Sequence, residues 1–499
     1  METHFDVLIL GTGLTQSITA AALSKAGHTV AHIDLENYYG GDQASLTQEE
    51  LIDWYKKRPS QNNFISSAEL LPFSRSYSIS LAPALIPSVG PLIDTIVGSG
   101  VSRYGRFKLL DASFVYDSSQ TLAFRRVPGS KEDIFRARDI SLIDKRKLMR
   151  FLQFALSNFE NKQEIGENEG TAFDTFLKDK FDLDTISREG IVYALAHCQS
   201  GTEPTLSSIT RLRDYLRSAG KYGNSPFLIG HYGGLGELAQ GFCRACAVNG
   251  GVYILGHKIL SLKLPDESRS SPAAIELEGV PDTLTADIVI ADQRHLLHAD
   301  TGRPISSEEP VPQCAYAIAI LNRPIGVPVS ISPEEETKGH PLDTCIVTFS
   351  PGSLPTGASA VVVRALQVGE DTLSCPSGKY ILYLWTKLLP LPSSMNSSKG
   401  LLQPYLDALV QPDAVEFSCF YTIDDVVDGS ISGNLLTSSR TLLVPQLPPS
   451  WTEMGDVSAR SAESLFREVM RLKALADEDE DEVPFWPPVD RTEEDDDEF

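Results

Sequence analysis

The chain has 499 residues, of which 42% are hydrophobic and 22% charged, which is typical of a soluble globular protein with more than one core. Its net charge of −24 argues against nucleic acid as a partner, because phosphate contacts need a basic surface. Seven cysteines in so long a chain do not indicate a disulfide framework, so we expect a cytoplasmic protein. Three prolines and an aspartate interrupt the apolar stretch 79–98, so we expect no transmembrane segment.

The first predicted elements are a strand, a helix and a second strand. Residues 5–10, FDVLIL, are a short apolar run typical of a buried parallel strand, and no basic region precedes them, so we expect no signal peptide. Residues 14–27 predict a helix, and HTVAHID predicts a strand that ends at Asp34. Asp34 follows Gly11 by 23 residues, where dinucleotide-binding folds hydrogen-bond a ribose. The pattern therefore predicts an α/β dinucleotide-binding fold.

The turn between the first strand and the helix, LGTGLTQS, is a damaged phosphate-binding fingerprint. A working G-x-G-x-x-G turn has three glycines, and here Gly11 and Gly13 are kept while Gln16 takes the third place. The third glycine lets the helix pack close to the strand, so a glutamine there would push the helix away or fill the space of the phosphates. The turn is better evidence for the fold than for binding, and we expect no flavin or other cofactor.

Between about residues 140 and 220 several predicted helices follow one another with no strand between them. The segment 144–159 carries a helical stripe of apolar residues, and Ser141 or Asp144 is placed to cap its start. Such a run predicts an all-helical domain inserted into an α/β protein. We therefore divide the chain into a discontinuous first domain, a helical domain and a tail, which comprise residues 1–139 with 221–476, 140–220, and 477–499.

After the helical domain the chain returns to the first domain. Residues 235–248 predict a helix, which Gly250 and Gly251 end, and a strand follows. Further along, LKLPDESRSSPAAIELEG predicts a hairpin and ADIVIAD predicts a strand. GDVSARSAESLFREVMRL predicts a helix for which Asp456 is a candidate cap.

Two patterns stand out on the helix 235–248. Glu237, Gln240 and Arg244 are spaced i, i+3 and i+7, so they share one helix face. With two tyrosines nearby, at positions 39 and 253, this face is either a binding platform or solvated surface.

The helix also contains the cysteine pair CRAC, at positions 243 and 246. The pair indicates either redox chemistry or core packing. We favour core packing, because the pair lies inside a helix. We find neither metal-ligand spacing nor a nucleophile with its base.

The last segment is strongly acidic. Residues 477–499 contain thirteen acids and one arginine, so they carry half of the net charge. Runs such as DEDEDE and EEDDDE repel themselves, which predicts a solvated, disordered tail. The alternative is a docking peptide in which Phe485 and Trp486 are the anchors.

Five segments, in order, resemble the family of Rab GDP-dissociation inhibitors and Rab escort proteins. They are FDVLILGTGLTQSI, HIDLENYYGGDQASL, SRYGRFKLLDASFVY, YGNSPFLIGHYGGLGELAQGF and NGGVYIL. The resemblance implies the fold of flavoprotein monooxygenases and oxidases with the dinucleotide function lost. Gln16 agrees with that loss, as does Asp292, where related flavoproteins usually have a small residue.

The resemblance also implies partners. Members of the family bind GDP-loaded Rab GTPases and shield the geranylgeranyl lipid on the Rab in the helical domain, with only transient membrane association. Carried over by motif, the Rab-binding platform consists of Tyr39, Glu237, Gln240, Arg244 and Tyr253. A mobile loop that contacts the Rab would be residues 221–234, in which HYGGLGE has one glycine more than the usual YG-x-GE.

Two further segments, FCRACAV and RRVPGSKEDIFRARDISLIDKRKLMRFLQF, resemble the escort branch, whose members also present new Rabs to the Rab geranylgeranyltransferase alpha/beta heterodimer. This implies a non-catalytic accessory subunit in which the helix 144–159 carries the transferase contact, with Phe154 as its anchor. Phe151 belongs either to that contact or to the domain core. The alternatives are a dissociation inhibitor that recycles prenylated Rabs and a flavin-dependent oxidoreductase, which the fold and Asp34 support and Gln16 opposes.

Overall fold

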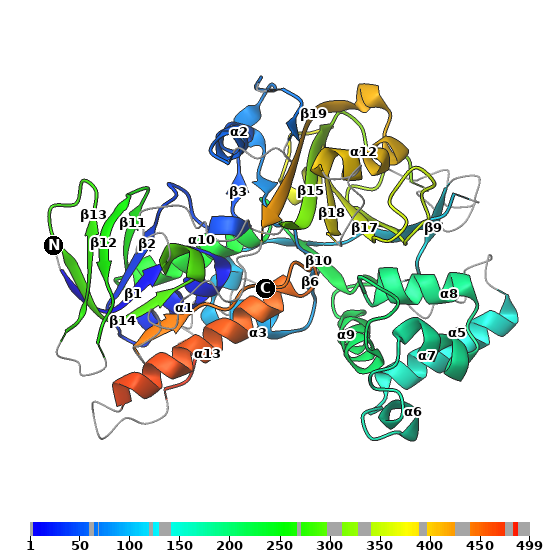
Figure 1. Ribbon diagram of the computed structural model, residues 1–499, viewed down its shortest axis with the longest axis horizontal. Coiled ribbons are helices and arrows are strands. Elements are labelled where there is room, and N and C mark those ends of the chain that lie inside the picture. Colours follow the sequence, from blue (N-terminus) through cyan, green and yellow to red (C-terminus); the bar gives the residue numbers. More distant parts are fainter. Residues whose placement is uncertain are drawn as a thin grey trace, which may run out of the picture.

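The computed structural model arranges the chain in three parts (Figure 1). A seven-stranded sheet lies at the left of Figure 1, an eight-stranded sheet at the upper right, and a helical unit at the lower right. The residues that the structure describes are 3–58, 64–67, 69–118, 123–128, 141–266, 271–296, 312–327, 341–388, 397–424, 440–474 and 483–487. Within these ranges no helix combines the length and the apolar character needed to cross a membrane.

The seven-stranded sheet contains the strands predicted at the N-terminus. In spatial order its strands are β11 (Val252–Leu255), β2 (Val30–Asp34), β1 (His4–Leu10), β14 (Leu284–Ala291), β13 (Ala273–Leu277) and β12 (Ile259–Lys263), with β20 (Thr441–Leu443) also paired to β14. Strands β11, β2, β1, β14 and β20 are parallel, and β12 and β13 form the predicted antiparallel hairpin. The arrangement confirms the predicted α/β dinucleotide-binding architecture.

Alternate residues of β1 face different layers, as the period of a strand requires. Val7 and Ile9 pack with the helices, whereas Leu8 and Leu10 pack with the hairpin. The helices are α1 (Leu14–Lys25), α3 (Pro91–Ser99), α10 (Leu235–Val248) and α13 (Met454–Ala474). Asp456 lies inside α13 and accepts a hydrogen bond from the Leu92 amide at 3.0 Å, so it caps α3 and not, as predicted, its own helix.

The eight-stranded sheet was not predicted. Its spatial order is β4 (Phe64–Ile65), β19 (Val415–Asp424), β15 (Pro312–Leu321), β18 (Tyr380–Lys387), β17 (Val363–Val368), β16 (Cys345–Phe349), β8 (Ala112–Tyr116) and β9 (Phe124–Arg126). The strand β15 presents small residues, Ala317 and Ala319 among them, to the cluster that contains α12 (Ser398–Leu409). It presents Tyr316 and Ile318 to the cluster that contains α2 (Gln48–Lys56). The chain outside the helical unit thus contains two large sheets.

Short elements join these parts. The small sheets are β6 (Ile86–Pro87) with β10 (Phe227–Gly230) and β7 (Phe107–Leu109), and β3 (Ser45–Leu46) with β5 (Ile79–Ser80). The short 3-10 helices are η1 (Gly41–Gln43), η2 (Ser74–Ser76), η3 (Val101–Arg103), η5 (Glu370–Thr372) and η7 (Pro412–Ala414).

The helical unit lies where the inserted domain was predicted. It consists of α5 (Leu142–Leu156), α6 (Gln163–Gly166), α7 (Phe173–Phe181), α8 (Thr185–Glu189), the π-helix η4 (Gly190–Leu195) and α9 (Thr205–Ser218). Ser141 caps α5 as predicted, because its side chain accepts a hydrogen bond from the Asp144 amide. The unit has a core of its own, in which Phe151, Phe159 and Phe173 are fully buried.

The C-terminal segment, residues 483–487, differs from the prediction of a disordered tail over 477–499. Val483, Phe485 and Trp486 pack against the core cluster between the seven-stranded sheet and its helices. The physical reason is local: these apolar side chains interrupt the acidic runs and gain more from burial than from solvent. The acidic runs on both sides lie outside the described residues.

Candidate functional site

The predicted ribose acid already has protein partners. One carboxylate oxygen of Asp34, which is 2% exposed, accepts hydrogen bonds from the Thr12 amide at 2.7 Å and the Thr12 hydroxyl at 2.6 Å. Its other oxygen accepts the Glu36 amide at 2.9 Å, and the Thr12 hydroxyl oxygen accepts the Gly40 amide at 3.0 Å. Asp34 therefore holds the turn against the segment after β2. Both of its carboxylate oxygens, which would accept hydrogen bonds from a ribose, already accept them from the protein.

Side chains fill the space in which phosphates would lie. Gln16 is buried, and a Cβ built on Gly13 would lie 2.8 Å from Gln16 Oε1 and 3.0 Å from Gln43 Oε1. Gln43 also accepts a hydrogen bond from the Leu14 amide, at 3.1 Å. This amide belongs to the N-terminus of α1, the group that would bind a phosphate, so Gln43 takes the place of the anion.

A histidine closes the turn from the other side. Gly11 has a φ of +89°, and a Cβ on it would lie 2.7 Å from His295 Cε1, so only glycine fits there. His295 Nδ1 lies 2.7 Å from Asp292 Oδ1, and the amide nitrogen of Gln16 lies 3.5 Å from Asp292 Oδ2. Burial lowers the pKa of His295, but the Asp292 carboxylate outweighs burial and raises it to about 9. The pair is therefore charged at neutral pH.

These residues do not fit the dinucleotide that the fold implies. The acid meant for the ribose has internal partners, and Gln16, Gln43 and His295 occupy the surroundings of both glycines. We therefore assign no chemistry to a flavin or nicotinamide here. Across the described residues, no group of three or more His, Cys, Asp and Glu side chains is placed to hold a metal ion.

The three polar residues for which a binding platform was predicted lie on the helix α10. Gln240 and Arg244 are exposed, whereas Glu237 is half-buried, and burial raises the pKa of its carboxyl group. The guanidinium of Arg244 lies 4.6 Å from the ring centroid of Tyr104, which holds the side chain against the surface that follows α3. An acid, an amide and a cation thus lie along one helix face, with the cation held in place.

The two platform tyrosines lie together but differ in exposure. The rings of Tyr39 and Tyr253 meet edge to face at 5.7 Å. The hydroxyl of Tyr253 is buried close to the thiols of Cys243 and Cys246, which the sequence did not reveal. Both cysteines are buried, and burial raises the pKa of the Cys243 thiol to about 12. Redox-active thiols have lowered pKa values, so this pair serves core packing.

The prediction of one mobile loop over residues 221–234 is wrong for its second half. Its middle is the buried strand β10, which pairs with β6 and β7. Its end is hydrogen-bonded to the connection between β17 and β18. The Tyr232 amide donates to the Thr372 carbonyl, and the Gly233 amide donates to the Ser374 hydroxyl. The extra glycine has a reason here, since Gly233 and Gly234 both have positive φ, +84° and +81°.

Phe154 lies at the edge of the helical core, as the stripe predicted. It is half-buried, and its ring lies 5.3 Å from Phe181 and 6.1 Å from Phe159. The ammonium group of Lys162 lies 4.8 Å from the centroid of the same ring. Phe151 is fully buried, which places it in the core and resolves the two alternatives for that residue. Leu142 and Ile143, at the start of α5, are the more exposed apolar residues of this helix.

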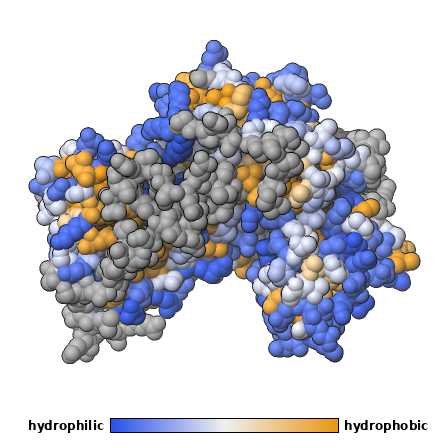
Figure 2. Space-filling view, viewed as in Figure 1, coloured by the Kyte–Doolittle hydropathy of each residue, from blue (hydrophilic) through white to orange (hydrophobic). Residues whose placement is uncertain are grey.

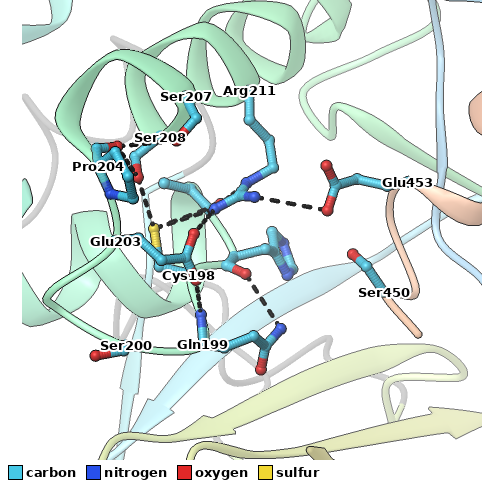
Figure 3. A network of polar contacts seen from close by, with 12 residues as sticks. Cys198, Gln199, Ser200, Glu203, Pro204, Ser207, Ser208, Arg211, Ser450 and Glu453 are labelled. Atoms are coloured by element: carbon cyan, nitrogen blue, oxygen red, sulfur yellow. Dashed lines mark hydrogen bonds and ion pairs between the residues drawn. The ribbon is translucent and has the colours of Figure 1, made fainter. Parts of the chain in front are cut away.

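A partly buried polar network, which the sequence gave no signal for, joins the helical unit to the rest (Figure 3). Arg211 of α9 donates to Glu203 at 2.6 Å and to the Ala196 carbonyl at 2.6 Å, and lies 3.5 Å from Glu453, which precedes α13. From β17, the guanidinium of Arg364 donates to the side chain of Gln199 and the carbonyl of Cys198. The network therefore ties α9 and the loop before it to the segment that precedes α13 and to β17.

Comparisons with known proteins agree on one family. Residues 1–330 match the family described as GDP dissociation inhibitor. A Saccharomyces cerevisiae protein named Rab proteins geranylgeranyltransferase component A is 31% identical over 395 residues, which cover 76% of this chain and 61% of that protein. The chain thus spans about three fifths of the length of this relative.

Two further comparisons point the same way. The Rab GDP-dissociation inhibitor of Saccharomyces cerevisiae is 30% identical over 335 residues, which cover 65% of this chain and 70% of that protein. The solved structure of a Rab GDI from Plasmodium falciparum covers 97% of this chain and 100% of its own, with a TM-score of 0.66 and 20% identity, and shows a shared fold.

Proposed function

Because the chain belongs to the GDP dissociation inhibitor family, we propose that it binds GDP-loaded Rab GTPases and acts as a Rab escort protein, a non-catalytic partner of Rab geranylgeranyltransferase. The observation that carries the proposal is the combination of this family match with a filled nucleotide turn. Gln16, Gln43 and His295 close the site in which a relative by fold would hold a redox cofactor. On α10, Gln240 and Arg244 are exposed and therefore accessible to a partner.

In this proposal the α10 face receives the Rab. Gln240 and Arg244 offer exposed polar contacts, and the paired rings of Tyr39 and Tyr253, which lie near Cys243 of the same helix, would add aromatic contacts. Arginine and tyrosine are enriched among the residues that dominate interface energies. We refer to Tyr39, Glu237, Gln240, Arg244 and Tyr253 together as the Rab platform.

The helical unit has two proposed tasks, contact with the transferase and shielding of the geranylgeranyl lipid. Phe154 and the exposed start of α5 offer apolar contacts for the transferase. Each buried methylene of a lipid contributes about 0.8 kcal/mol, so the unit would need a substantial apolar space. On the face shown in Figure 2 the helical unit, at the lower right, is mainly hydrophilic with separate apolar spots, so a lipid on this side requires the helices to part.

The test is reconstitution from purified parts. The chain, a GDP-loaded Rab, the transferase heterodimer and geranylgeranyl pyrophosphate are combined, and lipid transfer to the Rab is measured. We expect transfer that depends on the chain, with Rab platform variants lowering Rab affinity. No dependence on the chain, together with no transferase in a pull-down, contradicts the escort function.

The second candidate is a Rab GDP-dissociation inhibitor, which the similarity to the yeast inhibitor favours. An inhibitor would extract prenylated Rab from vesicles but would not bind the transferase. The pull-down separates the two functions, since both require the Rab platform and only the escort protein requires the transferase contact.

A further inference from the structure

A segment that lies far from α10 in the sequence packs along that helix and carries Tyr104. Val101 of η3 is 1% exposed, and a Cβ built on Gly241 of α10 would lie 2.9 Å from its Cγ1 atom. Four residues later, a Cβ built on Gly105 would lie 3.3 Å from Leu238 Cδ2 of the same helix. Both ends of the segment therefore pack against α10, and a glycine allows the close approach at each end.

Hydrogen bonds hold the backbone of this segment. Gly100 begins it with a φ of +79°, which favours glycine. The Tyr104 amide donates to the Val101 carbonyl at 2.9 Å, and the Gly105 amide donates to the same carbonyl at 3.2 Å. Because its neighbours on both sides are packed and bonded, the backbone of Tyr104 has a fixed place beside α10. The residue itself is 46% exposed, so it contributes little to a hydrophobic core.

The ring of Tyr104 lies against the cation of the Rab platform. The guanidinium of Arg244 is over this ring, 4.6 Å from its centroid. Arg244 follows Gly241 by three residues on α10, so the two share a helix face, and the packing of Val101 sets the distance between ring and cation. Within the part of the chain that the structure describes, the guanidinium forms no ion pair and donates no hydrogen bond. Its N–H donors are therefore available to a partner.

The ring has a consequence for the binding of such a partner. An exposed arginine side chain samples many rotamers, and a partner that binds it has to order it, which costs affinity. A guanidinium over an aromatic ring is attracted to the face of the ring, while its donors keep their planar fork. That fork matches the two oxygens of a carboxylate. The ring of Tyr104 therefore lowers the entropic cost of binding an acid at Arg244.

We propose that Tyr104 is a positioning residue of the Rab platform, which holds the guanidinium of Arg244 ready to bind a carboxylate of the Rab. The inference rests on the proposed function, and it adds to the platform a residue from a segment that none of the platform residues belongs to. The attraction between a cation and an exposed ring corresponds to a factor of about 2–5 in an equilibrium constant. We expect loss of the ring to weaken Rab binding by this factor.

The first experiment tests the positioning without any Rab. The δ-methylene protons of Arg244 are observed by NMR in the full-length protein with labelled arginine, and an Arg244→Lys variant identifies their signal. Protons near the face of an aromatic ring are shifted upfield. We therefore expect an upfield signal in the wild type and in Tyr104→Phe, which keeps the ring, and an ordinary signal in Tyr104→Leu. An ordinary signal in the wild type overturns the positioning role.

The second experiment measures affinity for one GDP-loaded Rab. The proteins are the wild type, Tyr104→Phe, Tyr104→Leu, Arg244→Ala, Arg244→Lys and the double variant Tyr104→Leu/Arg244→Ala. We expect Tyr104→Phe to match the wild type, Tyr104→Leu to bind about 2- to 5-fold more weakly, and the double variant to bind no more weakly than Arg244→Ala. Arg244→Lys keeps the charge without the fork and should bind more weakly than the wild type. Melting temperatures of the Tyr104 variants should agree, because the residue is exposed.

The outcomes separate the positioning role from the proposed function. Wild-type affinity in Tyr104→Leu overturns the positioning role and leaves the proposed function standing. A further loss in the double variant, as large as that of Tyr104→Leu alone, also overturns it, because the ring would then contact the Rab directly. A lowered melting temperature in Tyr104→Leu would show a structural role instead, and wild-type affinity in Arg244→Lys would exclude the carboxylate fork. Failure of every protein to bind the Rab refutes the proposed function and the positioning role together.

Discussion

Phe154→Ala tests whether the helical unit contacts the transferase, and the structure sets the size of the effect on stability. Truncating a fully buried phenylalanine costs about 3–5 kcal/mol. Phe154 is half-buried and contacts Phe159, Phe176 and Phe181 on one side, so we expect a loss of about 2 kcal/mol. Phe151→Ala is the matched control, because this neighbour is fully buried and should cost the full amount.

Three measurements on the same proteins decide the role of Phe154. Calorimetry gives stability, titration gives affinity for Rab-GDP, and the purified prenylation reaction gives transfer. We expect Phe154→Ala to fold, to bind Rab-GDP within about twofold of the wild type, and to lose prenylation, since an aromatic anchor is often worth about 2 kcal/mol or more. A destabilisation as large as that of Phe151→Ala would show that Phe154 is a core residue. Intact prenylation would refute the anchor and direct attention to Leu142 and Ile143.

Arg244→Ala should weaken Rab-GDP binding by about 1–3 kcal/mol, which titration measures. The melting temperature, measured by calorimetry, should change little, because the side chain is exposed. Unchanged affinity would remove this residue from the proposed interface. The purified protein should show no flavin absorption, and Gln16→Gly should not restore it, because other side chains still fill the turn; a stoichiometric flavin band in the wild type would contradict the reasoning. Because the folded-state pKa of His295 is raised to about 9 from an ordinary 6.5, the stability from its pair with Asp292 is complete below about pH 6.5 and is lost as the pH rises through 9. Thermal melts should show a loss of roughly 3 kcal/mol at most over that range, and Asp292→Asn should flatten the profile.

The sequence predicted those parts of the fold that depend on local pattern. The strands that end at Leu10 and Asp34, the helix from Leu235, and the helical unit all follow from hydrophobic period and glycine punctuation. The eight-stranded sheet was missed because its strands come from distant segments, such as β8 beside β16, and pair only in the folded chain. No local period marks such pairings.

The candidate site shows the same division. Gln16 was identified because it breaks a short motif, whereas Gln43 and His295 reach the turn from elsewhere in the chain and carry no motif. The buried hydroxyl of Tyr253 was missed because spacing does not reveal which way a half-buried ring points. The composition of VPFWPP did suggest docking, but charge on both sides favoured the opposite interpretation.

The guanidinium of Arg364 limits how far the helical unit can move relative to the eight-stranded sheet. It is 1% exposed, and its donors meet the side chain of Gln199 and the carbonyls of Cys198 and Tyr193, at the junction of the helical unit with the second sheet. If the helical unit swung away as a rigid body, each of these charged hydrogen bonds would be lost, at about 1–3 kcal/mol or more apiece. These hydrogen bonds therefore oppose a hinge movement of the helical unit at this junction. The proposed lipid site would then form by movement of helices inside the unit, with the hydrogen bonds of Arg364 at the junction kept.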